Sequence, residues 1–329
     1  MEERGLYPLK FMPLFKDKIW GGNKIKDLLG VDYSPLNRLG ELWVLSAVEG
    51  EETVVENGFL AECTLKEVLE MYADELVGEN NFDRFGDDFP LLVKIIDAHD
   101  NLSVQVHPDD DYALANGMNN GKTEMWYVLQ ADEGAKIYTG FSVNETKADI
   151  INRTRNKTVG EVLHHDHAQQ GDLYYIPAGT VHAIGKGVLL AEIQQSSDST
   201  FRIYDWDRVD DNGNPRQLHL EEGLKVMNLS AQKETAKCHY HYHLNETSVM
   251  IECPYFVTNI IPLTTGLRKD LSNADTFFLY FCVAGKGFVS CMNSRIPIKA
   301  GEVIMIPAIA KEALLEPSPM MEILEITVL

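Results

Sequence analysis

The 329-residue chain has few cysteines, few basic residues and no long hydrophobic run. Its five cysteines are an odd number and include no Cys-x-x-Cys pair, which predicts free thiols in a reducing compartment and no cysteine-based metal site. The chain has only 29 lysine and arginine residues but 50 aspartate and glutamate residues, so nucleic acid is not an expected partner. Because no stretch of about 18 apolar residues and no signal-peptide pattern occurs, we expect no membrane span and a cytoplasmic location.

The remaining composition is that of an ordinary globular protein, with 45% hydrophobic and 24% charged residues. The length predicts about two domains. Short β-type runs bounded by Gly, Pro, Asp or Asn predict strands at residues 41–46, 91–96, 125–129, 188–193, 276–281 and 321–328. Helices are expected behind a Thr64–Glu67 capping box and at residues 219–227. The pattern therefore indicates a mainly β protein with a few helices.

An internal repeat relates the two halves of the chain. Residues 171–177 and 301–307 both begin with glycine and an acidic residue and both end with Ile-Pro. The first copy continues to Gly179 and His182, and this pattern resembles the second motif of the cupin superfamily. That resemblance implies two small jelly-roll barrels and a metal-binding role for His182. The second copy has Glu312 in place of the histidine, so the second barrel is predicted to hold no metal.

These observations predict a division of the chain into three parts. Residues 1–205 are expected to form a catalytic cupin barrel with small helical decoration. Residues 206–250 are expected to form a helical linking segment, and residues 251–329 a second, metal-free cupin barrel. The sequence leaves open whether the N-terminal strands pack on the second barrel.

The sequence also predicts a metal site. Gln105 and His107 are two positions apart, so on a strand their side chains point to the same face. Glu124 opens another predicted strand, and His182 ends the cupin motif. One amide oxygen, two imidazoles and one carboxylate form a donor set that suits Zn²⁺, with Fe²⁺, Co²⁺ and Mn²⁺ as alternatives.

Several sequence blocks occur in an order that resembles the type I mannose-6-phosphate isomerases, also called phosphomannose isomerases, in their short bacterial form. The blocks lie at residues 19–22, 40–43, 102–108, 121–125, 176–182 and 197–202, and the resemblance extends over about residues 6 to 205. It implies one Zn²⁺ per chain, held by Gln105, His107, Glu124 and His182. It also implies a small-molecule sugar phosphate substrate and interconversion of mannose 6-phosphate and fructose 6-phosphate through an enediol.

That chemistry needs cations for the phosphate and for the developing oxyanion. The resemblance implies that Arg202 is the essential arginine, which stabilises the enediolate or binds phosphate. The alternative for Arg202 is a surface salt bridge with Asp198 or Asp205. Lys122 is expected to contact phosphate or transfer a proton, unless it is a solvated hairpin lysine.

Four further residues complete the expected site. Lys94 lies in an otherwise apolar strand, which is compatible with a cleft position or with a lysine that reaches out at a barrel rim. Glu192 and Gln194 share a strand face and are expected to line the cleft, or to make structural hydrogen bonds. Asp198 is a candidate for assisting ring opening. The general base is left open among Lys122, Asp198 and a metal-bound water.

Two competing functions remain at this point. An Fe²⁺-dependent cupin oxidoreductase would normally offer His-x-His, so Gln105 disfavours it. A bicupin sugar-binding or regulatory protein with a vestigial site is disfavoured by the complete donor set. The sequence does not decide between a monomer and a homodimer.

Three other motifs are interpreted as structural. His239, His241 and His243 alternate with tyrosines and are expected on a solvated strand face rather than as a metal patch. The histidine-rich run at residues 164–167 is expected to be a surface loop. The Gly-Lys-Gly at residues 285–287 is expected to be a hairpin in the second barrel.

Overall fold

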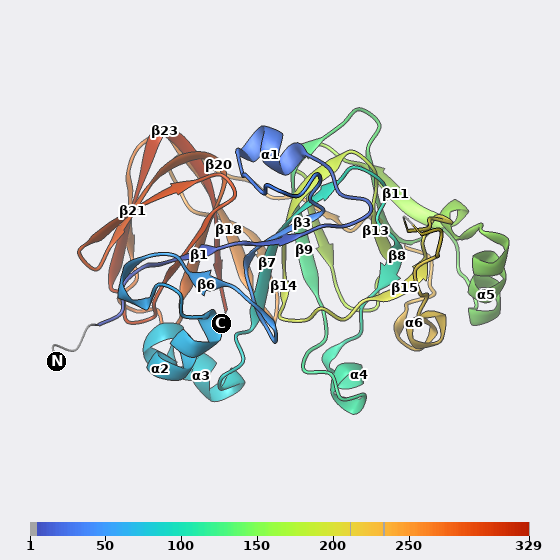
Figure 1. Ribbon diagram of the computed structural model, residues 1–329, viewed down its shortest axis with the longest axis horizontal. Helices are drawn as coiled ribbons and strands as arrows, with labels where there is room; N and C mark the ends of the chain where they lie inside the picture. Colours follow the sequence, from blue (N-terminus) through green and yellow to red (C-terminus); the bar gives the residue numbers. More distant parts are fainter. Residues whose placement is uncertain (1–4, 211, 233, 329) are drawn as a thin grey trace. The chain divides into compact units, whose positions relative to one another are not determined.

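The computed structural model describes residues 5–210, 212–232 and 234–328, and these residues are mainly β (Figure 1). The strands are β1 (Leu9–Met12), β2 (Leu14–Lys16), β3 (Glu41–Leu45), β4 (Ala47–Val48), β5 (Glu51–Glu52), β6 (Val54–Val55), β7 (Leu91–Ala98), β8 (Val104–Val106), β9 (Glu124–Ala131), β10 (Lys136–Phe141), β11 (Leu163–His167), β12 (Leu173–Ile176), β13 (His182–Ile184), β14 (Val188–Gln195), β15 (Phe201–Tyr204), β16 (Lys237–Cys238), β17 (Ser248–Glu252), β18 (Val257–Leu263), β19 (Leu267–Asp270), β20 (Phe278–Cys291), β21 (Ser294–Lys299), β22 (Val303–Ile306) and β23 (Glu312–Thr327). The helices are α1 (Lys24–Leu29), α2 (Leu65–Val77), α3 (Glu79–Phe85), α4 (Asp110–Ala115), α5 (Lys147–Asn156) and α6 (Leu220–Val226). None of the helices in the described ranges has the length and hydrophobicity needed to cross a membrane.

The local signals in the sequence are confirmed where they are strongest. Thr64 accepts a hydrogen bond from the Glu67 backbone N–H, and the Glu67 carboxylate accepts one from the Thr64 backbone N–H, so the predicted capping box begins α2. The predicted helix at 219–227 is α6. All six predicted strand runs overlap strands, and the two copies of the repeat form the equivalent strands β12 and β22.

The described residues form two compact units, and their boundaries differ from the expected 1–205, 206–250 and 251–329. The first unit contains the residues up to Leu14, Trp43–Val93 and those from His239 onward, and the second contains Phe15–Leu42 and Lys94–Cys238. The N-terminal strand joins the C-terminal strands because β1 pairs with β22. The expected linking segment is not a separate part, since α6 packs against β15 inside the second unit.

The first unit is built on one large antiparallel sheet. Its order is β17-β18-β23-β20-β22-β1-β6, with β19 beside β23 and β21 beside β20, and its C-terminal strands are orange to red in Figure 1. Alternate residues of these strands form a core that includes Tyr280, Ile304 and Ile323. The sheets formed by the described strands do not close into a barrel, so the two jelly-roll barrels stay a prediction.

Two further sheets carry the predicted site. One has the order β11-β10-β13-β8-β15, and the other has the order β16-β12-β9-β14-β7-β3-β2. Strand β14 is buried along its whole length, so it lies inside the protein rather than on its surface. The predicted metal donors lie in or directly after strands β8, β9 and β13, which are drawn from both sheets.

Three of the motifs interpreted as structural have a different local structure from the one expected. The run 164–167 belongs to strand β11 and is not a loop, because it pairs with β10. Residues 285–287 are not a hairpin but a bulge within β20, where the register with β23 shifts. Residues 239–243 follow β16 without strand structure, and His241 and His243 are exposed there.

Candidate metal centre and active site

The four predicted metal donors lie in or directly beside three strands of two sheets. Gln105 in β8 is the direct partner of His182 in β13, so their side chains lie on the same face of this antiparallel pair. His107 follows Gln105 by two positions. Glu124 enters from the other sheet as the first residue of β9. The structure therefore pairs Gln105 with His182 inside one sheet, while Glu124 comes from a strand of the other sheet.

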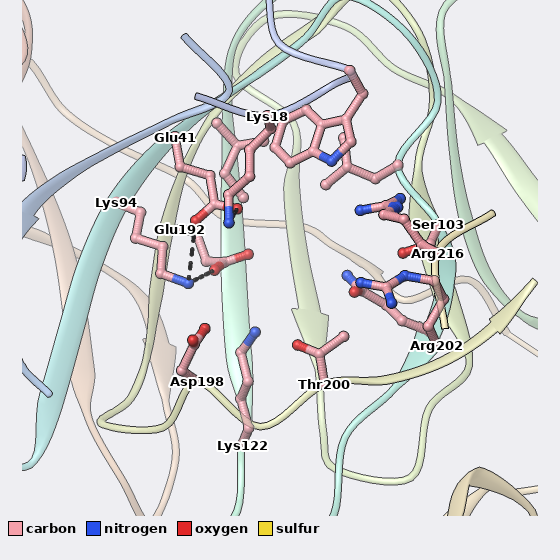
Figure 2. A pocket seen from close by; sticks show the side chains of 14 residues that line it. Lys18, Glu41, Lys94, Ser103, Lys122, Glu192, Asp198, Thr200, Arg202 and Arg216 are labelled. Atoms are coloured by element: carbon pink, nitrogen blue, oxygen red, sulfur yellow. Dashed lines mark ion pairs between the residues drawn. The ribbon is translucent and has the colours of Figure 1, made fainter. Parts of the chain in front are cut away.

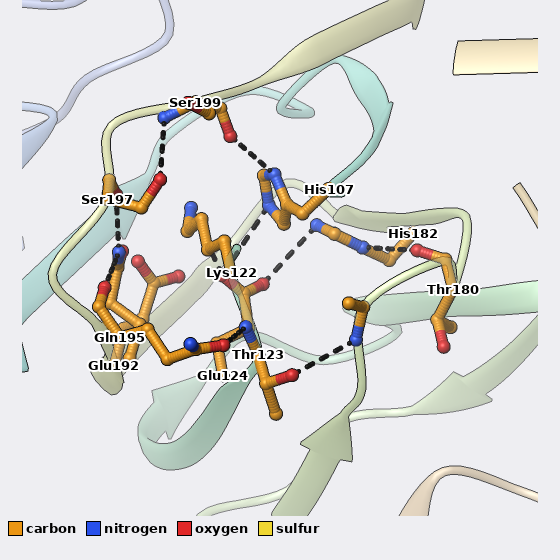
Figure 3. A network of polar contacts seen from close by, with 12 residues as sticks. His107, Lys122, Thr123, Glu124, Thr180, His182, Glu192, Gln195, Ser197 and Ser199 are labelled. Atoms are coloured by element: carbon orange, nitrogen blue, oxygen red, sulfur yellow. Dashed lines mark hydrogen bonds and ion pairs between the residues drawn. The ribbon is translucent and has the colours of Figure 1, made fainter. Parts of the chain in front are cut away.

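The structure brings the donor atoms of His107, Glu124 and His182 within 4.8 Å of one another (Figure 3). Nε2 of His107 lies 3.5 Å from Oε2 of Glu124, and Nε2 of His182 lies 3.3 Å from Oε1. None of the three side chains is more than 1% exposed. Gln105 is half-buried and lies in the wall of the adjoining cavity, beside this cluster.

Both histidines present an unprotonated nitrogen to the carboxylate. Nδ1 of His107 donates to the Ser199 carbonyl at 2.9 Å, and Nδ1 of His182 donates to the Thr180 carbonyl at 2.8 Å. Because a carbonyl can only accept, the proton sits on Nδ1 and the Nε2 lone pair points inward. Burial lowers the pKa of His182 to about 4 and that of His107 well below its ordinary value, so both rings are neutral.

This arrangement fits a bound cation. Both Nε2 atoms and Oε1 of Glu124 are buried without a hydrogen-bond partner among the described residues. Lone pairs and a carboxylate that face one another away from water cost free energy unless a cation lies between them. Two imidazoles and a carboxylate are a donor set typical of Zn²⁺ and related divalent metals.

A cavity of about 260 Å³ opens beside the metal donors (Figure 2). One of its walls carries both lysines and carboxylates, and the opposite wall carries two arginines. One wall alternates lysines and carboxylates: Lys18 lies 3.3 Å from Glu41, and Lys94 lies 3.3 Å from Glu192. The indole N–H of Trp126 donates to the other Glu192 oxygen at 2.9 Å and fixes this carboxylate. Lys94 is only 4% exposed, so it occupies the cleft position and not a rim position.

Lys122 connects the cavity with the metal donors. Its ammonium lies 3.1 Å from Oε2 of Glu124, and its side chain is buried. Burial by itself lowers the pKa of Lys122. The Glu124 and Glu192 carboxylates raise it by more, so the pKa is raised to about 12. Lys122 is therefore a buried cation and not a solvated hairpin lysine. Asp198 lines the same side of the cavity (Figure 2).

The opposite wall carries two guanidinium groups, with Ser103 and Thr200 beside them (Figure 2). Arg202 donates to the Gln217 carbonyl at 2.8 Å, while its Nε is buried without a partner among the described residues. Burial and the nearby Arg216 guanidinium lower the pKa of Arg202. Arg216 donates to the Asp205 carboxylate at 2.7 Å. Two adjacent cations beside hydroxyl groups form a site suited to an anion.

Gln194 does not line the cleft as expected. It is fully buried and donates to the backbone carbonyls of Gln195 and Ser197, at 2.8 Å and 2.7 Å. It thereby holds the turn that leads to Asp198. Of the two alternatives for Gln194, the structural hydrogen bonds are the ones observed.

Comparison with known proteins then decides the family. A family model for the catalytic domain of type I phosphomannose isomerase matches residues 9–138. Mannose-6-phosphate isomerase ManA of Bacillus subtilis is 37% identical over 304 residues, which cover 91% of this chain and 93% of that protein. The chain belongs to the type I phosphomannose isomerase family. The predicted resemblance is thus confirmed.

Two other relatives agree with this family. The mannose-6-phosphate isomerase of Streptococcus mutans is 35% identical over 302 residues, which cover 91% of this chain and 92% of that protein. The crystal structure of the mannose 6-phosphate isomerase from Bacillus subtilis matches with a TM-score of 0.86 and 30% identity. That match covers 97% of this chain and 99% of the other, so the phosphomannose isomerase fold extends over nearly the whole chain.

Three charged residues of the cavity were not predicted from the sequence of this phosphomannose isomerase family member: Lys18, Glu41 and Arg216. Glu41 lies inside a recognised block, and Lys18 directly precedes another, so both had a weak signal. Arg216 lies in the irregular segment between β15 and α6, where no pattern marks it. All three lie far along the chain from the metal donors, and only the folded chain places them in one cavity.

The Trp-Gly-Gly block that supplies Trp20 to the cavity requires a close backbone contact. A Cβ at Gly21 would lie 2.5 Å from the Gly40 backbone nitrogen, which cannot move aside easily. We therefore expect Gly21→Ala to lower the free energy of unfolding by about 1–3 kcal/mol, measured by urea denaturation. Gly5→Ala is the matched control, because a Cβ there meets nothing within 4 Å. Equal stability of the two variants would contradict this reading of the block.

Proposed function

We propose that the protein is a Zn²⁺-dependent isomerase that interconverts mannose 6-phosphate and fructose 6-phosphate. The observation that carries this proposal is the buried cluster of His107, Glu124 and His182 beside a cavity with a doubly cationic wall. Membership of the phosphomannose isomerase family supports the same reaction. We infer that Gln105, His107, Glu124 and His182 hold one Zn²⁺ per chain. When bound, the cation supplies Lewis-acid polarisation of a sugar oxygen.

The substrate phosphate would bind at the arginine wall. Arg202 and Arg216 are adjacent cations, and the hydroxyls of Ser103 and Thr200 line the same side. If the phosphate binds at this wall, C1 and C2 at the other end of the sugar would point toward Lys122 and the metal donors. Guanidinium groups bind phosphate through paired hydrogen bonds, which also orient the sugar.

The residues of the lysine and carboxylate wall would stabilise negative charge on the sugar and transfer protons. The reaction moves a proton between C1 and C2 and develops negative charge on the sugar oxygens. Lys122, held as a cation beside Glu124, would stabilise that charge where water is excluded. Asp198 is our candidate for ring opening, which transfers a proton from the O1 hydroxyl to the ring oxygen. Lys94 and Glu192, paired at 3.3 Å, would orient the sugar hydroxyls.

We also propose that the two units are the two barrels of a bicupin protein, with catalysis in the second unit. In the described part of the chain, the clustered histidine and carboxylate donors all lie in that unit. In the first unit, Glu312 replaces the repeat's histidine and pairs with Arg268 at 2.6 Å. The five cysteines are free thiols, which supports a reducing compartment such as the cytoplasm.

The test is conversion of mannose 6-phosphate to fructose 6-phosphate by the purified chain, before and after chelation. We expect activity to disappear when a chelator removes the metal and to recover on addition of Zn²⁺, with metal content measured by elemental analysis. Fe²⁺ and Mn²⁺ are returned in parallel to compare the metals. A zinc-loaded protein without isomerase activity would overturn the proposal and favour a sugar-binding or oxidoreductase cupin.

A further inference from the structure

The position of Lys122 is set by hydrogen bonds on both sides of it. On the N-terminal side, the Gly121 backbone N–H donates to Oδ1 of Asp110 at 2.9 Å. The same Oδ1 accepts a second bond, at 2.9 Å, from the side-chain amide of Gln195 at the end of β14. One carboxylate oxygen therefore connects the turn before Lys122 with the strand beside it.

Gln195 extends this connection to the C-terminal side of Lys122. Its side-chain oxygen accepts a hydrogen bond from the Thr123 backbone N–H at 2.8 Å (Figure 3). The Gln195 backbone N–H donates to the Thr123 carbonyl at 3.2 Å. Gly121 and Thr123 flank Lys122. The residues before and after the lysine are thus fixed by one chain of hydrogen bonds through Asp110 and Gln195.

The turn is packed too closely for other arrangements of its backbone. A Cβ at Gly121 would lie 2.6 Å from the Asp110 backbone nitrogen. The Lys122 N–H donates to the Pro108 carbonyl at 2.9 Å. Pro108 directly follows His107, so the same contact ties the lysine backbone to a metal donor. A shift of this turn would move the Lys122 ammonium away from Glu124.

We propose that Asp110 is a positioning residue that fixes Lys122 for the reaction. Its side chain is exposed, and it is not among the residues that line the cavity, so it acts through the backbone around Lys122 and not on the substrate. This inference rests on the proposed isomerase function, in which Lys122 stabilises the charge that develops on the sugar. Displacement of such a group by a fraction of an ångström lowers the rate strongly.

The experiment compares three variants with the full-length wild type. Asp110→Ala removes both hydrogen bonds, and we expect about a tenfold lower kcat, with KM, zinc content and melting temperature unchanged. Asp110→Asn keeps an oxygen that can accept both bonds, and we expect it to restore most of the activity. Asp111→Ala is the matched control. Asp111 is a second exposed acid in the first turn of α4, and its side chain makes no hydrogen bond or ion pair with the described residues, so we expect no change.

A double-mutant cycle distinguishes positioning of Lys122 from a general structural effect. In a Lys122→Met background, Asp110→Ala is expected to change the rate less than twofold, because the group that it positions is gone. An equal effect of Asp110→Ala in both backgrounds, or a wild-type kcat for Asp110→Ala, would overturn the inference. Failure of the proposed function is recognised separately, because the zinc-loaded wild type would then have no isomerase activity.

Discussion

His182→Ala is expected to remove the zinc and to lower kcat/KM by about 1,000-fold or more. The side chain supplies one of the converging buried donors, and its Nε2 lies 3.3 Å from Glu124. Loss of groups that only orient a metal ligand already costs about 10- to 100-fold in metal affinity or activity, so loss of the ligand itself costs more. The measurements are zinc content after dialysis and the rate of conversion of mannose 6-phosphate.

The control for this variant is His165→Ala. His165 is an exposed histidine on β11, in the same sheet as His182, and it lies outside the donor cluster. We expect it to keep both zinc and activity. If His182→Ala retained the zinc content and rate of the wild type, the assignment of the metal centre would be wrong.

Lys122→Met is expected to lower kcat by about 100- to 10,000-fold while the zinc is retained. Methionine keeps most of the volume of the buried side chain but removes the ammonium that lies 3.1 Å from Glu124. Because the proposed role of this cation is to stabilise charge in the transition state, the loss belongs in kcat and not in KM. Steady-state kinetics on the zinc-loaded variant measures the two separately.

Lys186→Met provides the comparison for Lys122→Met. Lys186 is an exposed lysine between β13 and β14, and we expect its substitution to leave both constants unchanged. A raised KM with an unchanged kcat in Lys122→Met would show that the lysine contributes ground-state binding only, which would contradict its proposed role.

The candidate metal cluster could be predicted because its residues follow simple local rules. Gln105 and His107 share a face through the two-residue period of a strand, and His182 ends a turn motif with fixed glycine and proline positions. The cavity walls could be predicted only in part. Lys94, Lys122 and Arg202 were found through motifs, whereas Arg216 lies in an irregular segment, where neither periodicity nor a motif marks a residue.

The units show why local patterns do not give domain boundaries. The residues of β1 are those of an ordinary strand, but its partner β22 lies almost 300 residues further along the chain. The same limit applies to the histidine-rich run of β11, whose polar residues look like a loop until β10 pairs with them. Pairing between strands so far apart in the chain depends on which strand edges come together when the chain folds, and the local sequence does not specify this.

The sequence by itself predicted the mainly β character, because strand period, capping and turn chemistry act between near neighbours in the chain. The order of its motifs indicated the family and the histidine and carboxylate residues of the candidate metal cluster. Only the tertiary structure decided which charges face the cavity and which residue holds each of them. The Lys18–Glu41 pair, the adjacent Arg202 and Arg216, and the hydrogen bond from Gln195 to Asp110 join residues that are not neighbours in the chain. Such contacts arise from packing, so they become visible only when the chain is folded.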